Sequence, residues 1–190
     1  MYRMSALIVG LSVLAVGCSE STPSSPSSPS PSPGTSTTTT FTVPLSPANE
    51  VPAITNADAS GSGTATIALT AIKDGTGTIT SATANVQISV AGFQPGTTFT
   101  DAHIHNAAAG ANGGIFVSAG LSAGELTLVD GRGSIAKNGI SIPADRAAAI
   151  LANPAGHYFN VHTGLNPAGA IRGQLQGGGA SVDPGTALPY

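Results

Sequence analysis

The sequence TATIALTAIKDG at residues 64–75, followed by ATANVQISV at residues 82–90, carries the pattern that decides the fold. In both segments apolar residues alternate with polar or small ones, which is typical of strands that have one buried face and one exposed face. The Asp74-Gly75 pair between the segments is a hairpin signal. We therefore expect two antiparallel strands joined by a tight turn.

Short alternating runs recur on both sides of this hairpin, separated by turn residues. They lie at residues 41–45, 99–105, 115–118, 125–129, 157–162 and 170–175. The first run is expected to be a short edge strand, because Pro44 and Pro47 end it. Only residues 143–152 show a helical pattern, an Ala-rich window that begins with a proline. The sequence predicts an all-β fold, an antiparallel β-sandwich or flattened barrel of about seven to nine strands with one short helix.

Composition excludes some classes of partner and of covalent bond. Charged residues make up 8% of the 190 residues, and six Lys and Arg face nine Asp and Glu. Because the chain has no basic cluster, it lacks the electrostatic features of a protein that binds nucleic acid. Cys18 is the only cysteine, so the chain cannot form an internal disulfide.

The N-terminus has the features of a bacterial lipoprotein. Arg3 precedes an apolar run at residues 6–16, and the small residues before Cys18 resemble a lipobox. We expect residues 1–17 to be a signal peptide and Cys18 to carry the lipid that anchors the protein to a membrane. A plain secretory signal with an incidental cysteine is the alternative. The expected location is the bacterial cell envelope, in the periplasm or at the cell surface.

Composition also divides the remainder of the chain. Residues 18–40 begin with the lipidated Cys18 and are rich in Ser, Pro and Thr, which predicts a disordered tether. Residues 41–176 carry the strand pattern and form the expected β domain. Residues 177–190 are a Gly-rich tail with no clear pattern. The predicted arrangement is one domain held away from a membrane by an extended linker.

Three of the expected strands carry polar residues on one parity, opposite to the apolar residues. Alternate residues of a strand share a face, so neighbouring strands would gather these side chains on the side away from the core. The polar residues are Asp101, His103 and His105 in the first strand, Asn160 and His162 in the second, and Arg172 and Gln174 in the third.

This polar face has two main interpretations. Neutral imidazoles bind copper and zinc, so His103, His105 and His162 are candidate ligands for either metal, with Asp101 fixing a tautomer. Alternatively, the face is a hydrogen-bonded network beside solvent. Arg172 opposes a bound dication unless it pairs with Asp101 or serves an anionic substrate. No nucleophile elbow, phosphate loop or close pair of carboxylates is present, so no catalytic residue is assigned.

Four ordered motifs resemble those of the CHRD domain, which is named from chordin. They are AHIH at residues 102–105, GANG at 110–113, YFNVHT at 158–163 and IRGQL at 171–175, and NEVP at 49–52 is similar to the opening motif of the family. The resemblance covers about residues 41–176. It implies an extracytoplasmic β-sandwich whose molecular function is largely unassigned. In chordin this domain accompanies domains that bind growth factors.

The chain departs from the family pattern at three positions. Family members often have Gly where this chain has Ala107, Pro where it has Gly114, and Glu where it has Ala170. The last change removes an acid near Arg172. The His103-x-His105 pattern is also similar to the copper-binding strand of copper/zinc superoxide dismutase, an analogy confined to one motif.

The leading expectation is therefore a non-catalytic, membrane-anchored CHRD binding module outside the cytoplasm. Its partner would be an unidentified extracytoplasmic protein or another envelope ligand. One alternative is a copper or zinc site with redox chemistry like that of superoxide dismutase. The other alternative is a passive spacer in the cell envelope.

Overall fold

The computed structural model describes residues 34–182, which belong to the compact unit Pro31–Tyr190. The expected signal peptide, the lipidation site Cys18, the first part of the tether and the end of the tail lie outside the described residues. Ten strands and one α-helix are present within residues 34–182. The strands are β1 (Thr35–Leu45), β2 (Ser62–Lys73), β3 (Ile79–Ala91), β4 (Thr98–Asn106), β5 (Ile115–Ser118), β6 (Leu126–Thr127), β7 (Gly133–Ile142), β8 (His157–Thr163), β9 (Ile171–Gln174) and β10 (Gly179–Val182).

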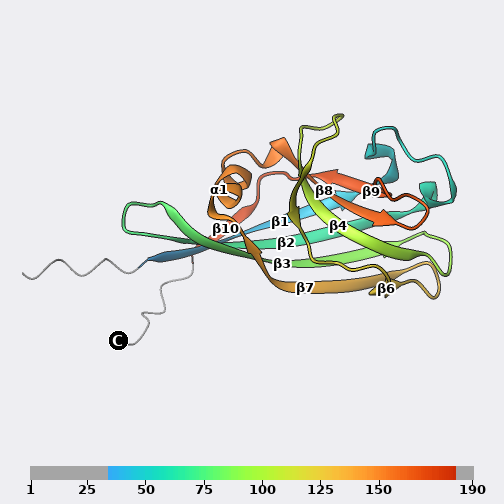
Figure 1. Ribbon diagram of the computed structural model, residues 1–190, viewed down its shortest axis with the longest axis horizontal. Coiled ribbons are helices and arrows are strands. Elements are labelled where there is room, and N and C mark those ends of the chain that lie inside the picture. Colours follow the sequence, from blue (N-terminus) through green and yellow to red (C-terminus); the bar gives the residue numbers. More distant parts are fainter. Residues whose placement is uncertain (1–33, 183–190) are drawn as a thin grey trace, which may run out of the picture. The chain divides into compact units, whose positions relative to one another are not determined.

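These strands form two antiparallel sheets (Figure 1). The first has the order β10-β1-β2-β3-β7, and the second has the order β5-β4-β8-β9 with β6 also paired to β4. The inward side chains of both sheets share one core, in which Phe41, Phe99 and Phe159 are fully buried. The predicted all-β sandwich with one short helix is confirmed.

The hairpin of β2 and β3 forms as the alternation predicts. Ile67 lies opposite Val86, and both side chains are buried against the second sheet. The turn is closed by the Asp74 carboxylate, which accepts hydrogen bonds from the backbone amides of Thr76 and Thr78. The residue with positive φ in this turn is Gly77 rather than Gly75.

The strand predicted at residues 41–45 is longer than expected, although residues 41–45 themselves lie at the sheet edge, because β10 pairs only with Thr37–Thr40. Strand β1 begins at Thr35, pairs with β2 along its whole length and also pairs with β10. Residues 35–40 therefore belong to a strand rather than to the tether, and the Gly-rich tail contains β10. The physical reason is that Thr is β-branched and favours strands when a partner is available, although its repeats look like linker sequence.

Strand β7 was not expected, because its alternation is interrupted. The pairing of β7 with β3 shifts between Ala84 and Val86, and Gly139 takes a φ of 66° at this irregularity. The predicted helix is confirmed as α1 (Ala144–Ala152), which buries Ala147 and Ile150. Three short 3-10 helices lie in the described loops, η1 (Pro47–Asn49), η2 (Ala57–Ser60) and η3 (Pro154–Gly156).

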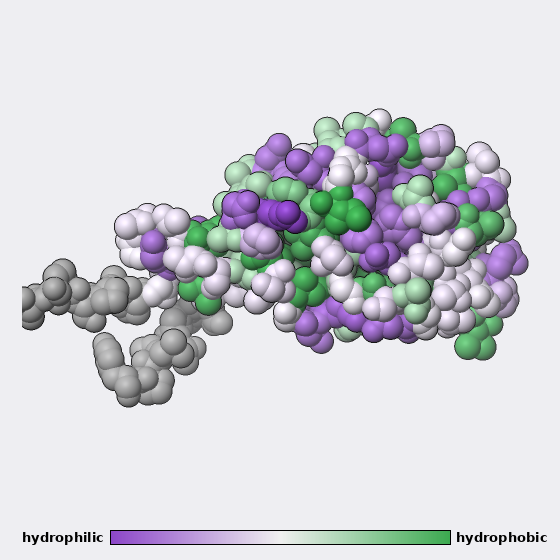
Figure 2. Space-filling model, in the orientation of Figure 1, coloured by the Kyte–Doolittle hydropathy of each residue, from purple (hydrophilic) through white to green (hydrophobic). Residues whose placement is uncertain are grey.

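Hydrophilic, pale and hydrophobic residues are mixed on the surface (Figure 2). Figure 2 shows a face on which much of the surface is pale and the hydrophobic residues lie in separate patches. The exposed large hydrophobic residues are Val51, Ile72, Ile115, Val129 and Leu165. Among residues 34–182, no helix has the length and hydropathy needed to cross a membrane.

The extended β1 strand makes a testable prediction about the domain boundary. A chain that starts at Phe41 should be less stable than one that starts at Gly34, by at least about 2 kcal/mol, because it loses backbone hydrogen bonds to β2 and β10. Urea unfolding of the two truncated chains measures the difference. Equal stability would mean that residues 34–40 contribute nothing to the fold.

Candidate metal centre

Strand pairing brings the polar residues of β4, β8 and β9 onto one face. Asp101 lies opposite His162, and His103 lies opposite Asn160, which in turn lies opposite Arg172. Since cross-strand partners point to the same side of a sheet, all of these side chains share a face. The three strands that carry the polar residues are therefore neighbours, as the interpretation of one shared face requires.

The expectation that this face meets solvent holds only at its margin, where the Asp101 side chain is 42% exposed. His103, His105 and His162 are only 6–7% exposed, and Asn160 and Arg172 are also buried. Backbone carbonyls from two loops, those of Gly113 and Pro167, contact the histidine rings directly. Apart from Asp101, the face is therefore a buried polar layer between the second sheet and the loops that cover it.

The three histidines converge within this layer. One nitrogen from each ring can be chosen so that all three lie within 4.8 Å of one another. The closest pair is His103 Nδ1 and His162 Nε2, at 3.1 Å. His105 completes the group, with its ring centroid 5.5 Å from that of His103 and 6.1 Å from that of His162.

The opposite nitrogen of each ring contacts an oxygen atom. His103 Nε2 lies 3.0 Å from Asp101 Oδ1, His105 Nδ1 lies 3.0 Å from the Gly113 carbonyl, and His162 Nδ1 lies 2.9 Å from the Pro167 carbonyl. A carbonyl or ionised carboxylate only accepts hydrogen bonds, so these three nitrogens must donate. In neutral rings the remaining nitrogens, His103 Nδ1, His105 Nε2 and His162 Nε2, therefore carry lone pairs that point into the cluster.

This arrangement leaves the inner nitrogens poorly satisfied. His103 Nδ1 and His162 Nε2 face each other with no proton to share, and buried His105 Nε2 has no hydrogen-bond partner among the described residues. Burial lowers the pKa of all three histidines, with a further contribution to His105 from the charge of Arg172. Neutral rings with inward lone pairs are the form in which histidine binds metal ions.

Glu50 is a buried acid that the sequence analysis did not single out as a site residue. It accepts a hydrogen bond from Asn160 Nδ2 at 3.1 Å, and its Oε2 lies 3.9 Å from Arg172 Nε. Burial raises the pKa of Glu50 to about 7, against the opposing effect of Arg172. Arg172 thus pairs with Glu50 and not with Asp101. The one sequence signal was the resemblance of the NEVP segment to a family motif.

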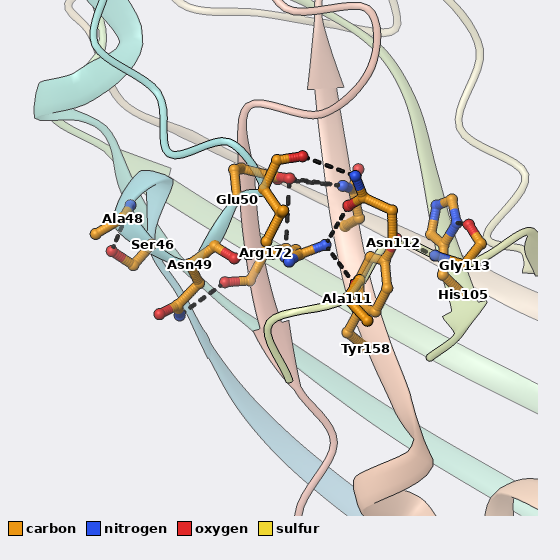
Figure 3. A network of polar contacts seen from close by, with 12 residues as sticks. Ser46, Ala48, Asn49, Glu50, His105, Ala111, Asn112, Gly113, Tyr158 and Arg172 are labelled. Atoms are coloured by element: carbon orange, nitrogen blue, oxygen red, sulfur yellow. Dashed lines mark hydrogen bonds and ion pairs between the residues drawn. The ribbon is translucent and has the colours of Figure 1, made fainter. Parts of the chain in front are cut away.

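Arg172 is held mainly by neutral groups (Figure 3). Its Nε donates to the Asn49 carbonyl, and its Nη1 donates to Ala111 O and Asn112 Oδ1. Its guanidinium lies 4.5 Å from the centroid of the Tyr158 ring. The Tyr158 ring in turn stacks on His105 at 4.8 Å with an interplanar angle of 2°. A buried cation, a phenol ring and a cluster histidine therefore form one column.

Gln174 lies on the same face but has a structural role. Its side-chain amide donates to the carbonyls of Ala107 and Ala155. His157 lies on β8 with the parity opposite to that of His162, so it stays outside the cluster, and its Nδ1 contacts the carbonyl of Asn153. The fourth histidine is therefore a buried residue on one of the cluster strands that provides a natural control for experiments.

The loop that supplies the Pro167 carbonyl is fixed by a second polar network. The buried Asp58 carboxylate accepts hydrogen bonds from Thr163 Oγ1 and Asn166 Nδ2, each at 2.6 Å. Gly169 ends this loop with a φ of 134°, and a Cβ there would come within 2.3 Å of Asn160 Nδ2 and 2.9 Å of Glu50 Oε1. The loop that orients His162 is thus positioned by side chains from the η2 region.

Two cavities border the polar layer. One of about 430 Å³ is lined by His105, Tyr158 and Glu50 together with residues of the covering loops. The other, of about 470 Å³, is lined by Glu50 and Arg172 and extends toward Gln176. Both volumes are in the range of small-molecule sites, and Glu50 lies at the wall of each.

The fold and the site define an all-β sandwich with a buried cluster of three histidines. The CHRD domain family matches residues 41–175, and the chain belongs to this family. Family membership suggests a binding module. Comparisons with curated proteins and with solved structures found no match.

The raised pKa of Glu50 predicts a pH-dependent contribution to stability. Between about pH 4.5 and about pH 7 the folded chain binds more protons at Glu50 than the unfolded chain, so this group lowers stability as the pH rises through that range. The Glu50→Gln variant should therefore gain stability relative to the parent across this window, by at most about 3 kcal/mol. Urea unfolding at several pH values measures the gain.

The matched control is Glu125→Gln. Glu125 is an acid whose pKa is lowered by the hydrogen bond from Lys137, so its removal should produce no gain with rising pH. A stability difference between Glu50→Gln and the parent that stays constant from pH 4.5 to pH 8 would contradict the assignment.

Proposed function

We propose that this domain binds one transition-metal ion, copper or zinc, through His103, His105 and His162. The observation that carries the proposal is the orientation of the rings. Each ring donates its outer N–H to an oxygen atom, so three lone pairs converge on one buried position. A set of neutral imidazoles suits zinc and copper, whereas magnesium and calcium prefer oxygen ligands.

The spacing supports this donor set. Metal–nitrogen bonds of about 2.0–2.1 Å in a tetrahedral arrangement place the ligand nitrogens about 3.3 Å apart. The 3.1 Å separation of His103 Nδ1 and His162 Nε2 is close to that value. The largest separation within the cluster is 4.8 Å, so binding requires a ring to shift toward the other two. Three protein ligands would leave an open position for water or another small molecule.

A purely hydrogen-bonded network fits the same residues less well. To share a proton, either His103 or His162 would have to be an imidazolium, since the outer nitrogens of both rings already donate. Burial opposes that charge and lowers the pKa of both histidines. The network would also leave His105 Nε2 without a partner in the described part of the chain. A bound cation satisfies all three nitrogens.

Asp101 would serve the metal indirectly. Its carboxylate also accepts a hydrogen bond from the Ala102 amide, which fixes its position beside His103 Nε2. A carboxylate on the outer nitrogen of a ligating histidine sets the tautomer and raises the basicity of the ligand.

The cavity beside His105 supports a second candidate function, redox chemistry of bound copper with a small molecule. A passive spacer would need neither feature.

Metal titration of the purified chain tests the proposal. In a Cys18→Ser background, which removes the thiol as a competing ligand, the parent should bind one equivalent of copper or zinc. The triple variant His103→Ala/His105→Ala/His162→Ala should lose this binding. His157→Ala is the control and should retain it, because His157 lies outside the cluster. Equal binding by the triple variant and the parent would overturn the site.

We further propose that the protein is a lipoprotein of the bacterial cell envelope that displays the CHRD domain outside the cytoplasm. The support is the lipobox-like sequence before Cys18 and the Ser/Pro/Thr-rich segment after it. Metabolic labelling with a clickable fatty acid should label the parent and Ser19→Ala, but not Cys18→Ala. Labelling of Cys18→Ala at the level of the parent would exclude the anchor.

A further inference from the structure

We propose that the buried charge of Arg172, which lies against the Tyr158 ring that stacks on His105, makes the three-histidine cluster favour monovalent over divalent copper. We further propose that Glu50 opposes this preference. The inference rests on the proposed function, because it assigns the electrostatic control of the same site. It gives Arg172 and Glu50 roles as tuning residues that do not touch the metal.

The geometry places Arg172 where its charge acts on His105. The guanidinium lies 4.5 Å from the centroid of the Tyr158 ring. The same ring stacks in parallel on the His105 ring, with 4.8 Å between the two centroids. Cation–ring attraction holds the guanidinium on Tyr158, and Tyr158 holds the plane of His105. The free Nε2 of His105 is the nitrogen available to the metal.

The charge of Arg172 is poorly neutralised. Its side chain is 4% exposed, and its hydrogen-bond acceptors are neutral, namely two backbone carbonyls and the Oδ1 of Asn112. Buried Nη2 has no partner among residues 34–182. Glu50 is the nearest acid, but 3.9 Å separates Oε2 from Nε, which is too long for a hydrogen bond. A buried charge of this kind is only weakly screened by salt.

The same field acts on any cation in the cluster. Burial is the main cause of the lowered pKa of His105, and the charge of Arg172 adds to it, so both disfavour an added positive charge on this ring. Divalent copper carries one more positive charge than monovalent copper, so the repulsion from Arg172 favours the reduced ion. The ionised carboxylate of Glu50 has the opposite sign and favours the oxidised ion. The two residues therefore predict changes of opposite direction when each is neutralised.

The reaction that reports this preference is a one-electron exchange. Ferrocyanide gives one electron to protein-bound divalent copper, which yields monovalent copper and ferricyanide, and no proton or bond is transferred. The parent, Arg172→Gln and Glu50→Gln are loaded with one equivalent of copper in the Cys18→Ser background and equilibrated at pH 8, where Glu50 is ionised. The divalent fraction is read from its electron paramagnetic resonance signal.

Arg172→Gln should lower the ratio of monovalent to divalent copper by about tenfold, which corresponds to about 59 mV for one electron. Glu50→Gln should raise the ratio by a similar factor, and the double variant should return close to the parent. Arg172→Lys keeps the charge and should stay nearer the parent than Arg172→Gln does. Arg146→Gln is the control, because Arg146 also lies over an aromatic ring, that of Phe116, but outside the cluster.

The outcomes separate this inference from the proposed function. If the parent binds no copper or zinc, the metal site itself is absent. If copper binds to the cluster but Glu50→Gln and Arg172→Gln shift the ratio in the same direction, or leave it unchanged, the electrostatic role is overturned while the site stands. If Arg172→Gln does not fold, Glu50→Gln with Arg172→Lys still decides, since an unchanged ratio in Glu50→Gln overturns the inference.

Discussion

The antiparallel pairing of β4 with β8 is the constraint on which the site depends. This register sets Asp101 opposite His162 and His103 opposite Asn160, so that His162 lies diagonally across from His103 and the two rings meet. A slip of one residue would send one strand's polar side chains into the core and its apolar side chains out of it. The buried Phe159 and Val161, on the other face of β8, therefore fix the position of the histidines.

Burial of this face depends on loops that are distant in sequence. The covering loops supply the carbonyls of Gly113 and Pro167, and the second of these is held in place by Asp58 through Asn166. Enclosure removes water from the imidazoles and lowers their pKa, which keeps them neutral. The sheet brings the three rings together, while the loops select the tautomer of His105 and His162 and so turn one nitrogen of each inward.

The sequence predicted features that depend on local periodicity and missed those that depend on long-range contacts. The shared parity of His103 and His105 follows from strand geometry, so it could be predicted from residues 101–105 alone. The partnership of Glu50 with Arg172 could not, since an irregular segment after β1 brings the carboxylate over β9. Burial of the polar face was missed for the same reason. Strand β7 was missed because a bulge breaks its alternation, and the start of β1 because repeated Thr looks like linker.

The charged residues around the histidine cluster bear on which metal ion the proposed site would bind. Ala170, two residues before Arg172, is buried in the hydrophobic core and brings no acid to the cluster. Among the described residues, the acids beside the polar layer are then Asp101, which bonds to a ring, and Glu50, which faces Arg172. A site with three neutral nitrogen donors, no carboxylate ligand and a buried cation nearby disfavours hard, highly charged ions. If the proposed site binds a metal, the absence of a ligating acid would therefore favour a soft ion of low charge.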